Sequence, residues 1–184
     1  MGYEVVSFLE MTAPTQLVPG RPPPSKIELE VVEPDAVAEL RATNVRVGRP
    51  HAWRGRTVWS DAEWAEELTR PGVRAWIARA DGHVAGMIEL EAEPGGDVGI
   101  VVFGLVPEFV GRGFGGALLE IAARFAWSLG DPTRRVWLQT STRDHPHALP
   151  NYERRASACS VPNAGSTRRP PASRRAGPPR RRGA

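Results

Sequence analysis

A glycine-rich loop between a strand and a helix occupies the middle of this chain. Residues 98–106 are almost continuously apolar, which is typical of a strand in the buried middle of a sheet. Pro107 follows, and a helix with one apolar side is expected over 113–129. Four glycines cluster at the start of that helix: Gly111, Gly113, Gly115 and Gly116. Glycines there let a ligand approach the backbone, whose N–H groups and dipole favour a phosphate. Because four glycines exceed what one tight turn requires, we expect an anion site.

The elements around this loop follow from local patterns. Ser60-Asp-Ala-Glu63 is a capping box that opens a helix. Asp81-Gly82 between two apolar runs indicates a hairpin. The expected strands are 27–31, 73–80, 83–92, 98–106 and 136–140, and the expected helices are 34–46, 60–69, 113–129 and 146–155.

Two well-known phosphate-binding folds fit this pattern poorly. A P-loop needs Gly-Lys-Ser/Thr, and the loop contains no lysine. A dinucleotide fingerprint is matched literally by residues 111–116, but the loop lies far from the first strand and follows a hairpin instead of a βαβ unit. The next strand, 136–140, also has no acid at its end to bind a ribose. A different phosphate site is therefore favoured.

Residues 107–119, PEFVGRGFGGALL, resemble the pyrophosphate motif of GNAT acetyltransferases, whose pattern is Gln/Arg-x-x-Gly-x-Gly/Ala. Gly113 and Gly115 match, and Val110 stands where Gln or Arg is usual. The order of elements over about 26–155 is similar as well. The resemblance implies an α+β fold with a mixed, mainly antiparallel central sheet flanked by helices.

A second segment, 144–155, is similar to the family's Asn-x-x-Ala-x-x-x-Tyr block. Ala148 and Tyr152 fall in register, with His145 where Asn is usual. The family ordinarily continues into Gly-Phe and a final hairpin that covers one side of the acceptor site, whereas here the chain reads Ala156-Ser-Ala-Cys. We therefore expect the last strands to be missing, with an exposed apolar sheet edge and low solubility as a consequence.

Both ends of the chain differ in composition from its middle. Residues 1–25 hold a Pro-rich run and are predicted to be a disordered lead, with Met11 as an alternative translation start. Residues 156–184 carry seven Arg, no acid and one bulky aliphatic residue, and are predicted to be a disordered basic tail. Residues 1–155 hold 17 basic and 21 acidic side chains, so the basic character belongs to the tail. The tail resembles an out-of-frame reading of a GC-rich gene, and a frameshift near Arg155 is the expectation; a natural disordered tail is the alternative.

The family resemblance implies transfer of acetyl from acetyl-CoA to a primary amine by direct attack. Backbone groups of Phe103 and Leu105 would bind the pantetheine arm, and an amide near Leu105 could stabilise the oxyanion. Tyr152 would protonate the departing thiolate. The pyrophosphate would be held by the amides of Gly111, Arg112, Gly113, Gly115 and Gly116, and the Arg112 side chain could add a charged contact.

The sequence nominates no clear general base, and water could serve instead. His145 and His147 do not complete a metal site, so no metal is expected. The acidic residues near the relevant strands are Glu89, Glu91 and Glu108. Four tryptophans could line an acceptor pocket, although core packing explains most of them better: Trp53, Trp59, Trp64 and Trp76.

Other properties limit where and with what the protein works. No apolar run is long enough for a transmembrane helix, the N-terminus lacks signal-peptide features, and Cys159 is the lone cysteine, so a cytoplasmic protein is expected. The expected partner is a small-molecule or peptide amine, and a homodimer is possible. A non-catalytic acyl-CoA-binding module is one alternative. Weak nucleic-acid binding through the tail is another, but the tail has no aromatic residues for base stacking.

Overall fold

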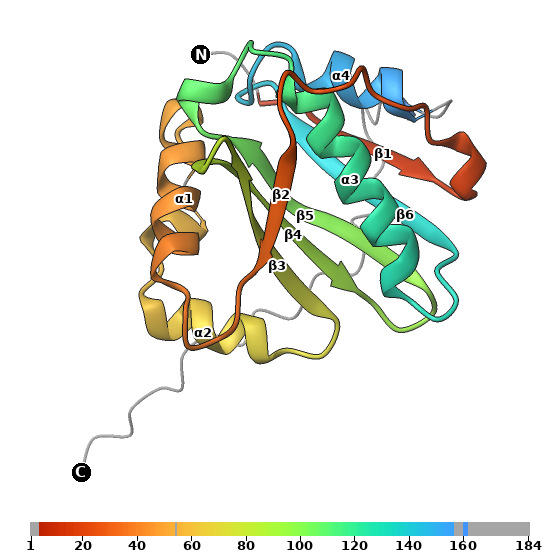
Figure 1. The fold of residues 1–184 in the computed structure, drawn as a ribbon. Helices are drawn as coiled ribbons and strands as arrows, with labels where there is room; N and C mark the ends of the chain where they lie inside the picture. Colours follow the sequence, from red (N-terminus) through yellow and green to blue (C-terminus); the bar gives the residue numbers. More distant parts are fainter. Residues whose placement is uncertain (1–3, 54, 157–159, 162–184) are drawn as a thin grey trace.

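The computed structural model describes residues 4–53, 55–156 and 160–161, which form one mixed sheet with helices on both faces (Figure 1). The strand order is β2-β3-β4-β5-β6-β1-β7. Only β5 and β6 pair in parallel, and all other neighbours are antiparallel. The predicted α+β class with a mainly antiparallel sheet is confirmed. The strands are β1 (Val6–Met11), β2 (Ile27–Val31), β3 (Val73–Ala80), β4 (His83–Ala92), β5 (Asp97–Leu105), β6 (Arg135–Ser141) and β7 (Ser160–Val161).

The helices follow the sequence patterns closely, with one shift. Helix α2 begins after Ser60, as the capping box predicts. The Ser60 hydroxyl accepts a hydrogen bond from the Glu63 N–H, and the Glu63 carboxylate accepts one from the Ser60 N–H. Helix α1 begins at Ala38 and not at Pro34 as expected, because residues 33–36 form a turn in which the Ala36 N–H donates to the Glu33 carbonyl. The helices are α1 (Ala38–Gly48), α2 (Asp61–Thr69), α3 (Phe114–Leu129) and α4 (Ala148–Arg155), with 3₁₀ turns η1 (Pro14–Gln16), η2 (Arg49–His51), η3 (Arg56–Val58) and η4 (Pro107–Phe109).

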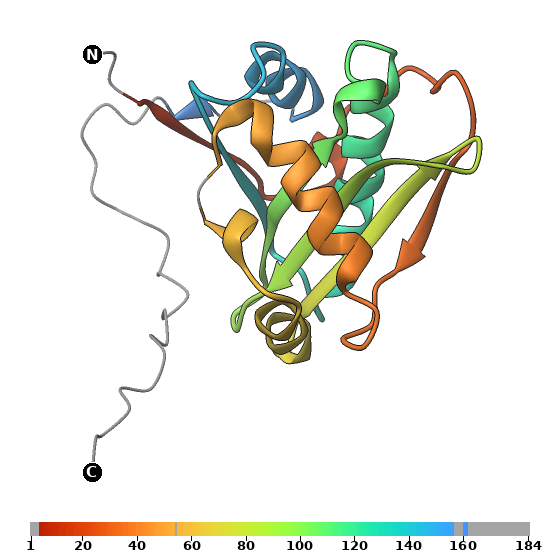
Figure 2. The ribbon, with the colours of Figure 1, turned by 90° about the vertical axis from the view of Figure 1, so that its left-hand side faces the viewer.

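The sheet buries one core on each face because successive strand residues point to opposite sides. Figure 2 views the molecule from the side covered by α1 and α2. On that side Leu40 and Trp64 pack against Ile77 and Met87. On the other side α3 packs Leu118 and its neighbours against Ile88 and Leu90, and α4 lies beside α3. Within the described ranges, no helix is both long and apolar enough to span a bilayer.

Residues 4–25 of the N-terminal lead are ordered, which corrects the prediction of disorder for them, whereas residues 1–3 lie outside the described residues. Strand β1 pairs antiparallel with β6 along its whole length, from Val6 opposite Ser141 to Met11 opposite Val136. Leu9 and Met11 are buried. The Pro-rich run that follows packs along α3: the Gly20 N–H donates to the Glu120 carboxylate at 2.5 Å. The run of prolines therefore rests on the folded domain.

β1 covers the edge of β6, and the expected low solubility stays a prediction. Two residues near the C-terminus, Ser160 and Val161, pair in turn with β1 as β7. The rest of the basic tail, with the predicted frameshift, disorder and weak nucleic-acid binding, lies outside the described residues.

Candidate functional site

A large cavity lies where the two parallel strands β5 and β6 stop pairing. Pairing between β5 and β6 ends at Ile100 and Leu138. On its other side β5 carries a β-bulge, since Glu89 lies opposite Val102 and the next β4 residue lies opposite Ile100. A bulge bends its strand, so β5 diverges from β6 here. The resulting cavity has a volume of about 790 Å³, within the range of ligand pockets.

The backbone of β5 offers hydrogen-bonding groups to this cavity. The Val106 N–H donates to the Ala85 carbonyl of β4 at 2.9 Å. Since backbone groups alternate along a strand, those of Phe103 and Leu105 face away from β4, towards the cavity that both residues line. These are the two positions predicted to bind an extended ligand arm.

The glycine loop closes one end of the cavity. Gly111 and Gly113 have φ angles of +76° and +88°, which glycine adopts without strain. The first N–H groups of a helix have no partner inside it, and none of those from Gly111 to Gly116 is bonded to another part of the described chain. Gly111, Gly113, Gly115 and Gly116 line the cavity. Unpaired amides at a helix N-terminus suit an anion.

Basic side chains gather near this loop, but Arg112 is not among those that line the cavity. Its guanidinium instead lies 5.0 Å from the centre of the Phe109 ring and donates to the Glu108 carbonyl. Arg21, Arg154 and Arg155 line the cavity. Arg21 was not predicted as a site residue, because a Pro-rich lead gives no local sign that it packs on the domain.

Arg155 ties the N-terminal lead to the glycine loop. A terminal nitrogen of its guanidinium lies 2.9 Å from where a side-chain carbon on Gly116 would sit. The same group donates to the Pro19 carbonyl, and its Nε is buried without a partner. A positive charge is therefore held against the first turn of α3. No local pattern distinguishes Arg155 from its neighbours in the sequence.

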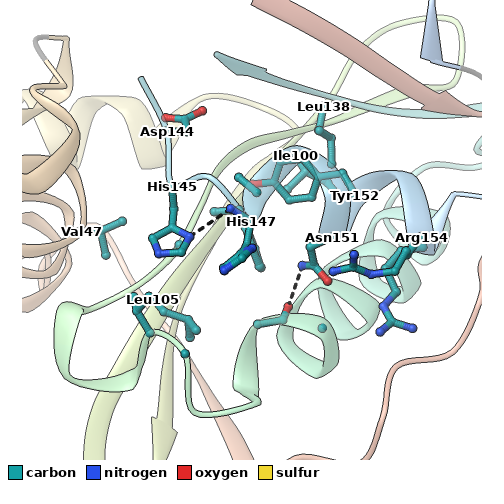
Figure 3. Close-up of a pocket in the computed structure, with 18 of the residues that line it drawn as sticks. Val47, Ile100, Leu105, Leu138, Asp144, His145, His147, Asn151, Tyr152 and Arg154 are labelled. Atoms are coloured by element: carbon teal, nitrogen blue, oxygen red, sulfur yellow. Dashed lines mark hydrogen bonds between the residues drawn. The ribbon is translucent and has the colours of Figure 1, made fainter. Parts of the chain in front are cut away.

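Tyr152 projects from α4 into the same cavity, near Ile100 and Leu138 (Figure 3). Its ring meets Phe103 edge to face, with the ring centres 6.1 Å apart. Burial, and secondarily the charge of Asp144, raises the pKa of the Tyr152 phenol above its usual value. The phenol therefore keeps its proton at neutral pH and is a potential proton donor. Asn151, one residue earlier, donates to the Gly115 carbonyl at 3.4 Å and joins α4 to α3.

A second, more polar cavity of about 520 Å³ adjoins the first. Asp144 lies between the two, and its carboxylate accepts hydrogen bonds from the Trp53 indole at 2.9 Å and the Thr140 hydroxyl at 2.7 Å. This carboxylate joins the segment after α1 to the loop after β6. The residues that line both cavities are His51, Trp53, Val101, Val102, Gln139 and Asp144.

The acidic residues considered as bases lie elsewhere. Glu89 is fully buried and paired with Arg56, and burial raises the pKa of its carboxyl group. Glu91 is paired with Arg70, and Glu108 with Arg46. None of the three glutamates lines either cavity.

The histidines and tryptophans divide between the cavities and the core. His145 and His147 line the larger cavity. Trp53 is the one predicted tryptophan that reaches the cavities, because Trp59, Trp64 and Trp76 pack in the core clusters. Across the described part of the chain, no three His, Cys, Asp or Glu side chains are grouped so as to hold a metal ion.

One comparison, with models of protein families, identifies a family. The model of the acetyltransferase (GNAT) family matches residues 36–156. No curated protein sequence matches the chain. A GCN5-related N-acetyltransferase from Sphaerobacter thermophilus is similar in structure with a TM-score of 0.60 and 21% identity, over 82% of this chain and 47% of that one. A second GCN5-related N-acetyltransferase, from Kribbella flavida, is also only 47% covered, so this chain spans about half the length of both proteins.

Two other solved structures are covered almost completely. An aminoglycoside acetyltransferase from an uncultured soil metagenomic sample, in complex with sisomicin, has a TM-score of 0.58 at 10% identity, over 72% of this chain and 90% of that one. A ribosomal-protein-alanine N-acetyltransferase from Brucella melitensis has a TM-score of 0.53 at 16% identity, over 73% and 93%. At these identities the likeness is one of fold.

Proposed function

Because the chain belongs to the acetyltransferase (GNAT) family, an acyltransferase family that uses acetyl-CoA, we propose that it transfers acetyl from acetyl-CoA to a primary amine by direct attack. One observation carries the proposal. A single cavity brings together unpaired amides at the start of α3, the outward-facing backbone of β5 and the buried phenol of Tyr152.

The residues around the cavity suit the cofactor. The amides of Gly111, Arg112, Gly113, Gly115 and Gly116 would bind the diphosphate, with the positive end of the α3 dipole behind them. Arg21, Arg154 and Arg155 line the same cavity and would add opposite charge. Backbone groups of Phe103 and Leu105 would hold the pantetheine arm as a neighbouring strand would be held.

When bound, acetyl-CoA supplies an acetyl thioester whose carbonyl carbon a neutral amine can attack. An amide near Leu105 would donate to the oxygen that becomes negative during that attack. Tyr152 would donate its proton to the sulfur as the carbon–sulfur bond breaks, which its raised pKa allows because the phenol stays protonated. The apolar neighbours of Tyr152 would keep water from the thioester.

The adjoining polar cavity is the proposed acceptor site, since it shares Trp53, Val101 and Asp144 with the cofactor cavity. The amine itself is undetermined. Fold neighbours include an aminoglycoside acetyltransferase and a ribosomal-protein-alanine N-acetyltransferase, which supports a test panel of aminoglycosides, peptide N-termini and simple polyamines.

Two measurements on the full chain test the proposal. Calorimetry should detect association with acetyl-CoA, and a thiol-release assay over the amine panel should show turnover with at least one amine. Binding without turnover across the panel would favour the non-catalytic acyl-CoA-binding module. If acetyl-CoA at millimolar concentration does not associate while an NAD analogue does, the proposal is wrong.

A further inference from the structure

We propose that His51 is the general base that takes the proton from the acceptor amine, an inference that rests on the proposed function. His51 is the last residue of η2 and is one of the few side chains that line both the cofactor cavity and the polar cavity. A base that deprotonates the amine has to stand where the amine meets the thioester. His51 lies at that junction.

A hydrogen bond fixes which nitrogen of His51 can accept a proton. Nδ1 lies 3.2 Å from the backbone carbonyl oxygen of Arg143. A carbonyl oxygen only accepts, so Nδ1 carries the hydrogen in the neutral ring and Nε2 keeps its lone pair. Nε2 has no hydrogen-bond partner in the described part of the chain. The same bond persists after Nε2 is protonated, which supports the imidazolium that forms.

The Arg143 carbonyl is itself held in place. The Asp144 carboxylate accepts from the Ser141 N–H at 2.9 Å and the Thr140 hydroxyl at 2.7 Å, which fixes the turn after β6. Trp53, two residues after His51, donates its indole N–H to the same carboxylate at 2.9 Å. Asp144 therefore positions both the turn that carries the Arg143 carbonyl and the segment that carries His51.

The neighbouring titratable groups are less suited to this role. Nδ1 of His145 accepts the backbone N–H of His147 at 3.2 Å, so the neutral His145 ring carries its hydrogen on Nε2 and has no second lone pair to offer. Glu4 is paired with Arg143. His147 lines only the cofactor cavity. The charged or titratable groups lining the two cavities around His51 are Glu4, Arg21, Arg56, Arg143, Asp144, His145, His147, Tyr152, Arg154 and Arg155.

The proton balance is complete with the groups at hand. Nε2 of His51 removes one proton from the ammonium group, and the neutral nitrogen then forms the new bond to the acetyl carbon. As the carbon–sulfur bond breaks, Tyr152 supplies its proton to the leaving sulfur, and the second proton of the nitrogen passes through solvent water to the Tyr152 oxygen. Overall the ammonium gives up two protons: one balances the proton on sulfur and the other is released to solvent.

His51→Asn tests the role in catalysis. The asparagine amide can still donate to the Arg143 carbonyl but cannot act as a base, so kcat/KM should fall by about 10²–10⁴-fold. The ascending limb of the pH profile that reports the base should disappear, and the affinity for acetyl-CoA should change by less than about two-fold. His83→Asn, at the exposed β3–β4 turn away from both cavities, is the matched control and should leave all three quantities unchanged.

Nitrogen NMR of the unliganded protein gives a readout that does not depend on activity. We expect the neutral His51 ring to carry its proton on Nδ1 and the His145 ring on Nε2, with resonances assigned from His51→Asn and His145→Asn. The inference is overturned if His51 carries its proton on Nε2, or if His51→Asn keeps the rate and the pH limb while His145→Asn loses them. A wild-type protein that releases thiol with no amine would instead contradict the proposed function, and the role of His51 with it.

Discussion

Tyr152 shows how the surroundings of one buried side chain change its pKa. Its phenol has no hydrogen-bond partner in the described chain, and its pKa is raised because charge is costly among Phe103, Ile100 and Leu138. The phenol therefore stays protonated at neutral pH, as the proposed role of proton donor requires.

We predict that Tyr152→Phe lowers kcat by about 10²-fold or more and leaves the acetyl-CoA dissociation constant within about three-fold. Phenylalanine keeps the packing against Phe103 and removes only the proton. Steady-state thiol release and calorimetry measure the two quantities. If kcat and the affinity for acetyl-CoA fell to the same extent, the role of Tyr152 would be to pack against its neighbours and not to donate a proton.

Arg56 and Glu89 form an ion pair whose contribution to the stability of the fold depends on pH. Glu89 is inaccessible to solvent, and its second carboxylate oxygen has no partner. Burial raises its pKa above 4.5, with Arg56 opposing that rise. As pH increases above 4.5, the unfolded chain releases this proton while the folded chain retains it until its higher pKa is reached, so the contribution of Glu89 to stability falls across that window.

Arg56→Met should therefore destabilise the fold by about 3–5 kcal/mol at pH 7, because Glu89 stays buried without its counter-charge. The loss should shrink towards pH 4, because protonation of Glu89 removes the charge that Arg56 neutralises. Urea unfolding of wild type and variant at the two pH values measures the difference. A loss that is independent of pH would contradict this assignment.

At the level of elements, local patterns with a stereochemical cause were predictable from the sequence. The Ser60–Glu63 capping box starts α2 at its predicted residue. Asp81 and Gly82 both adopt positive φ in the predicted hairpin turn. The glycine loop was predictable because repeated glycines at a helix start favour a close approach of a ligand to the backbone. The start of α1 was missed because Pro34 fits an isolated turn as well as it fits a helix.

Gly113→Ala should reduce stability by about 1 kcal/mol and also weaken acetyl-CoA binding. At φ +88° a side-chain carbon strains the backbone, and the loop amides would shift. Gly82→Ala is the matched control, because Gly82 also has a positive φ, +76°, with open space around it. It should cost similar stability in thermal melts and leave binding intact. Equal affinity of the two variants for acetyl-CoA would show that the loop amides do not bind the ligand.

At the scale of the whole molecule, the pairings between distant segments were not predictable. Nothing in residues 6–11 specifies β6 as a partner, and the prolines that follow resemble those of a disordered segment. His51 and Arg155 likewise acquire their neighbours only through tertiary contacts, since Arg143 and Gly116 lie far away in sequence. Patterns of three to ten residues identify single elements. The candidate site, in contrast, is built from residues that are far apart in the sequence.

A chain that starts at Met11 should lose most of β1 and so expose the unpaired edge of β6. We predict a lower melting temperature and self-association, because an open apolar edge templates pairing with another copy. Sedimentation and thermal melts compare it with a chain lacking residues 1–3, which retains Val6–Met11. A monomeric Met11 variant with an unchanged melt would mean that β1 is dispensable.

The pairing of β1 with β6 also sets the order in which a growing polypeptide can finish its fold. Val5 and Thr142, bonded at the end of that pairing, are 137 positions apart. During synthesis, β1 leaves the ribosome first, but it can pair only after β6 has been made, when most of the domain has been synthesised. Contacts of such long sequence separation slow folding, so β1 stays unpaired until β6 has been synthesised, and an unpaired strand edge is a feature that chaperones recognise.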